Sequence, residues 1–151
     1  MTVRTSTRFR RERAAVPAAR AFAESALASS GTPSDVVERM VLATGEACNN
    51  VILHAAGDDF TVSIVVDRGG ARVAVSDAGT GFEPPLRPAM PSPLATGRRG
   101  LALMEALVDV VEVTSDPGGT TVVLGQAFGL ARPPALPGSF PGWTGALVAD
   151  G

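Results

Sequence analysis

The sequence predicts an α/β domain, a two-layer sandwich with about three helices on one face of a mixed β-sheet. The chain is 151 residues long, which is the size of one domain that buries roughly 70% of its unfolded surface. Segments with helical spacing of apolar residues alternate with segments of strand spacing. Their order is strand, two helices, two strands, long loop, helix and two strands, which is the order expected for helices packed on one face of a sheet.

The first part of the chain is predicted to form one strand and two helices. Residues 2–13 combine β-branched residues with arginines and are expected to form an edge strand followed by a solvated basic turn. Residues 17–29 open with proline and stop before a glycine, which favours a helix. The sequence TPSD at residues 32–35 is typical of a helix cap, and the longer helix that follows should reach about residue 54 or 55.

Two strands are expected next, over residues 61–66 and 71–76. Both alternate apolar and polar side chains, as half-buried strands do. The sequence DRGG at residues 67–70 lies between them, and its two glycines are typical of a tight hairpin. These two strands should therefore pair as neighbours in the sheet.

A loop, a helix and a second hairpin complete the predicted domain. Residues 82–96 contain five prolines and are expected to form a loop. Residues 101–108 carry apolar side chains at helical spacing. Strands over residues 110–114 and 120–124 are then joined by the sequence DPGG at residues 116–119.

The chain is expected to divide into a domain over residues 1–126 and a tail over residues 127–151. The tail is rich in proline and glycine, and its aromatic residues follow no helical or strand period. Such a segment cannot build a core of its own.

Composition excludes several classes of protein. The net charge of -2 and the pI near 5.3 argue against direct nucleic-acid binding through bulk charge.

The single cysteine, Cys48, lies within an apolar helical pattern and is expected to be a core thiol in a reducing compartment. The sequence has no run of about eighteen apolar residues and no signal segment. A cytoplasmic protein without a membrane partner is therefore expected.

Two polar side chains interrupt the long second helix. Glu46 and Asn50 are four residues apart and so share one helical face, just beyond the edge of the core-facing stripe. A carboxylate and an amide at such a boundary can be partly desolvated and still reach a ligand. Taken alone, the pair fits the surface of an amphipathic helix better than a ligand site.

A carboxylate and two glycines follow the strand over residues 71–76. Asp77, at the strand end, can accept a hydrogen bond from an amino group in a pocket. Gly79 and Gly81 let the backbone approach a flat ligand closely. Because Asp and Gly are ordinary turn residues, this motif by itself is also consistent with a simple strand exit.

Glycines and arginines precede the helix predicted over residues 101–108. Free backbone N–H groups and the positive end of the helix dipole make a helix start a candidate anion site. The pair Arg98 and Arg99, between Gly97 and Gly100, adds charge suited to phosphate. On its own the segment fits an arginine-decorated helix start equally well.

Together and in this order, the segments EACNN, DAGTG, GRRGLALM and GGTTV resemble the ATP-binding domain shared by gyrase, Hsp90, histidine kinases and MutL. This is the GHKL superfamily, and its domain is the Bergerat ATP-binding fold. The resemblance spans about residues 33–126. Within the superfamily the short chain, with one helix ahead of the Glu/Asn helix, is most similar to the bacterial anti-sigma-factor serine/threonine kinases. The resemblance implies a histidine kinase-like ATP-binding domain over residues 1–126.

The resemblance implies a role for each candidate residue. Glu46 corresponds to the general base, Asn50 to the Mg²⁺ ligand, and Asp77 to the residue that binds the adenine amino group. Two glycines shape the adenine pocket and a threonine supports it. The ATP-binding residues so implied, beyond the first three, are Gly79, Gly81, Gly97, Arg98, Arg99, Gly100, Leu101 and Thr120. ATP and Mg²⁺ are the implied cofactors.

The function that the resemblance implies is an ATP-dependent serine/threonine protein kinase that regulates transcription. Such a kinase binds a sigma factor and phosphorylates a STAS-type anti-sigma antagonist on serine, and a homodimer is also among the implied partners. The alternative is an ATP-dependent protein-binding regulatory module with little or no kinase activity. The Glu46 and Asn50 pair favours the enzyme. One departure from the family pattern favours the module. Arg98-Arg99-Gly100 stands where relatives commonly carry Gly-Arg-Gly.

Overall fold

The computed structural model describes residues 2–54, 57–77, 93–116 and 119–128. The described elements follow the order β1 α1 α2 β2 β3 α3 β4 β5. The strands are β1 (Val3–Arg10), β2 (Asp59–Asp67), β3 (Gly70–Ser76), β4 (Val110–Asp116) and β5 (Gly119–Ala127). The helices are α1 (Ala15–Ser29), α2 (Ser34–His54) and α3 (Pro93–Leu107).

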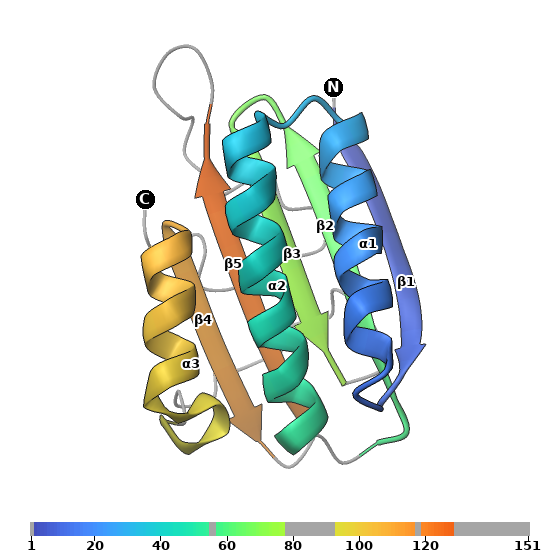
Figure 1. The fold of residues 1–151 in the computed structure, drawn as a ribbon, viewed down its shortest axis with the longest axis vertical. Helices are drawn as coiled ribbons and strands as arrows, with labels where there is room; N and C mark the ends of the chain where they lie inside the picture. The colour runs from blue at the N-terminus through green and yellow to red at the C-terminus, as the bar shows by residue number, and fades with distance from the viewer. Residues whose placement is uncertain (1, 55–56, 78–92, 117–118, 129–151) are drawn as a thin grey trace.

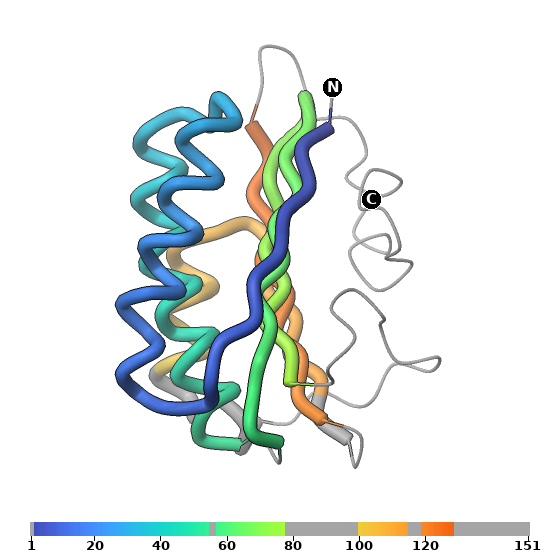
Figure 2. The backbone as a smooth tube through the Cα atoms, turned by 90° about the vertical axis from the view of Figure 1, so that its right-hand side faces the viewer, coloured from blue at the N-terminus to red at the C-terminus, as the bar shows by residue number. Residues whose placement is uncertain are grey.

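The elements form two layers. All three helices cover the same face of the sheet, and α2 lies between α1 and α3 (Figure 1). When the sheet is seen edge-on, the helices lie on one side of it (Figure 2). This arrangement confirms the predicted two-layer α/β class, with three helices on one face. The middle helix, α2, is therefore the one with neighbours on both sides.

The sheet has the strand order β1-β2-β3-β5-β4, with β1 at one edge as predicted. Every neighbouring pair among these strands is antiparallel, so the expectation of a mixed sheet is wrong. The reason is the position of the last strand. Because β3 and β4 are both antiparallel to β5, they run parallel to each other, as a single-helix crossover requires. However, β5 lies between them, and no parallel pair forms.

The main core lies between the helices and the sheet. Phe60, Val62 and Ile64 alternate along β2 toward the helices and are at most 1% exposed. A smaller cluster lies on the other face of the sheet and consists of Val65, Ala74 and Val123, with Val110 partly buried beside them.

The predicted core thiol is confirmed. Cys48 is fully buried within the main core, on α2. Burial raises the pKa of its thiol to about 12, against a smaller opposing effect of the positive charge on Arg20. The thiol is therefore neutral at physiological pH and packs as a small apolar side chain.

The predicted helices are confirmed for α1 and α2, but the predicted start of α3 is wrong. Residues 93–96 were expected to belong to the proline-rich loop, and instead they form the first turn of α3. Proline is tolerated there because the first N–H groups of a helix have no intrahelical partner. No helix within the described parts of the chain is both long enough and apolar enough to cross a membrane.

The last strand runs past the predicted domain boundary at residue 126. β5 ends at Ala127, and the backbone N–H of Phe128 donates a hydrogen bond to the carbonyl oxygen of Gly69 (3.1 Å). The Phe128 ring also packs against the main core. The folded domain therefore includes residues 127 and 128, and residues 129–151 lie outside the described residues.

The β2–β3 hairpin depends on Gly70, so we expect Gly70→Ala to destabilise the protein by roughly 2–3 kcal/mol. A Cβ atom at this position would lie 2.4 Å from the Gln126 carbonyl oxygen and 3.0 Å from the Ala127 Cα atom. Both are backbone atoms of the neighbouring strand β5, so the strands would have to separate. Urea unfolding measures the change. Gly57→Ala is the control, because its Cβ would meet no atom of the described residues closer than 4.0 Å. Equal effects of the two substitutions would contradict the prediction.

Candidate functional site

Asn50 is the most unusual polar residue of the long helix α2. Its side chain is 4% exposed, and neither its Oδ1 nor its Nδ2 atom has a hydrogen-bond partner within the part of the chain that the structure describes. A buried polar group without a partner costs about 1–3 kcal/mol. Buried polar groups are normally satisfied, so an exception of this kind is characteristic of an atom that binds a ligand or ion.

Glu46 lies one turn before Asn50 on the same helix and is half-buried. The predicted pairing of the two residues on one helical face is therefore present. The prediction that both lie just beyond the edge of the core stripe is wrong for Asn50, which is buried. The reason is that α2 is the middle helix and packs against both α1 and α3 (Figure 1). A helical wheel shows which face of a helix is apolar, but it does not show how many neighbouring helices pack against that helix.

Asp77 and Thr120 meet where β3 ends and β5 begins. The Asp77 N–H donates a hydrogen bond to the Thr120 carbonyl oxygen (3.1 Å), and the Thr120 N–H donates one to Oδ1 of Asp77. Thr120 is 1% exposed, and Asp77 is half-buried. The structure therefore pairs two residues that lie more than forty positions apart, and it holds the Asp77 carboxylate in a fixed orientation.

The elements that carry the candidate residues converge at one end of the molecule. The carboxyl ends of α2 and β3 and the amino ends of β5 and α3 all lie at the lower end in Figure 1. Separate elements thus contribute polar groups to one region. The Glu46 carboxylate and the Asn50 amide come from α2, and the Asp77 carboxylate comes from the end of β3. Such convergence of polar groups is typical of a ligand site.

The glycine and arginine segment is placed differently from the prediction. Gly97, Arg98, Arg99 and Gly100 lie within α3, which begins at Pro93, so the prediction that a helix starts at these residues is wrong, whereas their role in ATP binding stays a prediction. The free N–H groups of the first turn belong to earlier residues. Leu101 is half-buried and packs against the main core. Gly79 and Gly81 lie outside the described residues, and so do the side chains of Arg98 and Arg99.

Arg11 has a structural role that the sequence did not suggest. It was expected to belong to a solvated basic segment, but its Nη1 donates a hydrogen bond to the Ile52 carbonyl oxygen (2.9 Å) in the last turn of α2. Its Nε also donates to the Gly57 carbonyl oxygen. Carbonyl groups in the last turn of a helix lack intrahelical partners. Arg11 therefore caps the helix that carries Glu46 and Asn50, whereas Arg8, Arg10 and Arg13 are exposed as predicted.

Arg20 is a second residue that the sequence reading missed. It lies on α1, and its Nε atom is buried without a hydrogen-bond partner among the described residues. A Cβ atom at Gly45 would lie 2.8 Å from this Nε. The guanidinium therefore occupies the space left by a glycine one position before Glu46. The glycine itself could have indicated this contact, because alanine would be more stable inside a helix.

Comparison with known proteins places this site in context. Residues 9–125 match the family model described as a histidine kinase-like ATPase domain. Two relatives are each named serine-protein kinase RsbW. One, from Bacillus velezensis, is 34% identical over 106 residues, and the other, from Bacillus subtilis, is 32% identical over 106 residues. Each alignment covers 62% of this chain and 66% of the relative, so the chain spans about two thirds of their length.

A solved structure shows the same fold. The crystal structure of the RsbU and RsbW domains of a Mycobacterium tuberculosis protein matches with a TM-score of 0.63 and 24% sequence identity. The match covers 86% of this chain and 34% of that chain. The fold of this chain is therefore shared with a protein of low sequence identity.

Proposed function

Since this chain belongs to the histidine kinase-like ATPase domain family, we propose that it is an ATP-dependent serine/threonine protein kinase of the anti-sigma-factor type. The family resemblance predicted from the motifs is confirmed. Two relatives are named serine-protein kinases, which supports kinase activity at the level of the family. The proposal extends that activity to this chain and assigns it to the residues at the lower end of the molecule.

The observation that carries the proposal is the side chain of Asn50, which is buried and has no hydrogen-bond partner among the residues that the structure describes. Mg²⁺ prefers oxygen ligands and is usually held by substrate phosphates, waters and one or two protein groups. An amide oxygen that accepts no hydrogen bond from any described residue fits this requirement. When bound, Mg²⁺ would neutralise charge on the phosphates of ATP. Asn50 is therefore the proposed metal ligand.

Glu46 is the proposed general base. In the proposed reaction the hydroxyl oxygen of a serine on the partner protein forms a bond to the γ-phosphorus of ATP. The bond between that phosphorus and the bridging oxygen breaks, and ADP leaves. The proton of the serine hydroxyl passes to the Glu46 carboxylate, which lies one helical turn from Asn50.

Asp77 and Thr120 are the proposed adenine-binding pair. The Asp77 carboxylate, oriented by the Thr120 N–H, is suited to accept a hydrogen bond from the adenine amino group. Gly79 and Gly81 are proposed to border the same pocket, and Gly97 to Leu101 to cover the phosphates. These roles rest on the family resemblance, together with the position of the ends of α2, β3, β5 and α3 at one end of the molecule.

The proposed partners are a sigma factor and a STAS-type anti-sigma antagonist in the cytoplasm. A second candidate function is an ATP-dependent binding module with little kinase activity. The arginine pair at 98 and 99 favours this alternative, because it departs from the Gly-Arg-Gly that relatives commonly carry. Incubation of the purified protein with γ-labelled ATP and candidate antagonists from its own genome separates the two. Label on a serine of an antagonist supports the kinase, and tight ATP binding without transfer to any antagonist supports the module.

We expect Asp77→Asn to weaken ATP binding by roughly 10- to 100-fold, because a charged acceptor for the adenine amino group is lost. The amide oxygen of Asn can still accept the hydrogen bond from the Thr120 N–H, so the fold should be retained. Titration calorimetry with ATP and with GTP measures the change. GTP is the control ligand, since its base carries a carbonyl oxygen where adenine carries the amino group. Unchanged ATP affinity in the variant would remove Asp77 from the site.

A further inference from the structure

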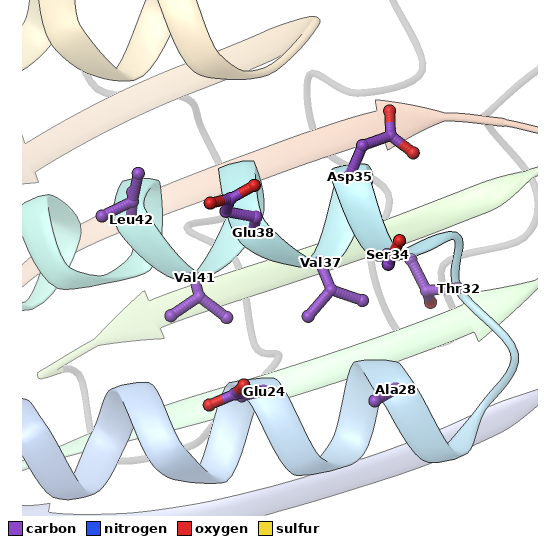
Figure 3. A pocket seen from close by; sticks show the side chains of 9 residues that line it. All are labelled: Glu24, Ala28, Thr32, Ser34, Asp35, Val37, Glu38, Val41 and Leu42. Carbon is purple, nitrogen blue, oxygen red and sulfur yellow. The ribbon is translucent and has the colours of Figure 1, made fainter.

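A groove separate from the candidate ATP site runs between α1 and the first half of α2 (Figure 3). Its volume is about 630 Å³, which lies within the roughly 300–1,000 Å³ typical of ligand pockets. The candidate ATP site uses the other half of α2, which carries Glu46 and Asn50. The groove is lined by Glu24, Ala28, Thr32, Ser34, Asp35, Val37, Glu38, Val41 and Leu42.

The floor of the groove is apolar. Val37 is 8% exposed and Val41 is half-buried, and both point from α2 toward α1 (Figure 3). Leu42, beside them, is 42% exposed, one of few large apolar side chains among the described residues to be so exposed. Covering such a surface with an apolar side chain would remove it from water, which is favourable.

The rim of the groove is acidic. Glu24 on α1 and Glu38 on α2 stand on opposite sides of it (Figure 3), and both are exposed. Neither forms an ion pair among the described residues. Asp35 does pair with Arg39 (3.4 Å), but its side chain is 77% exposed, and such surface pairs contribute little. Among the described residues, no basic side chain lines the groove. A positively charged group would therefore complement the negative charge of the groove.

Thr32 provides an independent sign that the groove binds something. It lines the groove and is 7% exposed, but its Oγ1 has no hydrogen-bond partner within the described residues. The sequence predicted that this residue helps to cap α2, but the hydroxyl makes no such bond. A buried hydroxyl without a partner is destabilising. It is explained if a ligand supplies the missing hydrogen bond.

We propose that this groove binds a basic segment of a partner protein, anchored by an apolar side chain. The aliphatic anchor would pack on Val37, Val41 and Leu42, and arginine or lysine side chains would pair with Glu24 and Glu38. A backbone or side-chain group of the segment would hydrogen-bond to Thr32. This is the chemistry of an amphipathic helix in a groove between two helices. The inference does not depend on the ATP site.

The first test uses a short synthetic amphipathic peptide of leucine and arginine, and a control peptide with glutamate in place of arginine. Amide chemical shifts of the full chain, recorded by NMR during the titration, should change around the groove for the arginine peptide only. The double variant Glu24→Arg/Glu38→Arg should lower the affinity by tenfold or more. Glu105→Arg is a single substitution of the same kind on the exposed face of α3, far from the groove, and should lower the affinity by no more than about twofold.

Thr32→Val tests the proposal without changing charge. It should lower the affinity for the arginine peptide by roughly three- to tenfold. It should leave the stability of the unbound protein equal or higher, because no hydrogen bond to a described residue is lost. Peptide binding that maps elsewhere, or that neither the double variant nor Thr32→Val weakens, would overturn the proposal. A self-association of the wild type that the double variant abolishes would instead assign the groove to a second copy of this chain.

Discussion

Replacing Glu46 with Gln is expected to slow phosphoryl transfer to serine by about 10²- to 10⁴-fold. Glutamine keeps nearly the same shape but cannot take the hydroxyl proton at neutral pH. A general base contributes only as the hydroxyl loses its proton, so the affinity for Mg·ATP should change by no more than about threefold. Glu46 is half-buried and lies one turn from Asn50. We therefore expect its replacement to slow phosphoryl transfer without weakening the binding of Mg·ATP.

The measurement pairs single-turnover transfer of labelled phosphate with calorimetry on the same preparation. Glu12→Gln is the matched control, because Glu12 is exposed just before α1 and belongs to no proposed site. Full transfer activity in Glu46→Gln would show that another group is the base. A large loss of Mg·ATP affinity in that variant would show that Glu46 binds the nucleotide in the ground state.

Replacing Asn50 with Ala is expected to weaken Mg-dependent ATP binding by about 10- to 100-fold, and transfer with it. The reason is that the amide oxygen would act on the bound metal in the ground state as well as in the reaction. Addition of EDTA should therefore weaken ATP binding to the wild type strongly and to the variant only slightly. Asn49→Ala is the control, because the neighbouring Asn49 is exposed.

The stability of the nucleotide-free protein distinguishes a ligand-binding role of Asn50 from a structural one. Because Asn50 has no hydrogen-bond partner among the described residues, the change to Ala removes no hydrogen bond within that part of the chain. The free energy of unfolding without ATP should then differ from that of the wild type by about 1 kcal/mol or less. The extra stability that saturating Mg·ATP gives to the wild type should largely disappear. A variant that is unfolded without nucleotide, or that binds Mg·ATP normally, would contradict the assignment.

Much of the fold was readable from local patterns. Local sequence patterns predicted all eight elements, and for α1, α2 and the four strands of the two hairpins the boundaries agree within a few residues. Local chemistry sufficed because helix and strand periods, proline positions and hairpin glycines act over a few residues. The order of the motifs also identified the family, which residues 9–125 match.

What the sequence determined by itself was therefore the elements, their order and the family. The tertiary structure decided the position of β5 between β3 and β4, the burial of Asn50 by two flanking helices, the direct pairing of Asp77 with Thr120, and the use of Arg11 to cap α2. It also decided which surface between α1 and α2 is left as a groove. Each of these depends on contacts between segments that are distant in the chain. A local pattern states which face of an element is apolar, but not which other element will cover it.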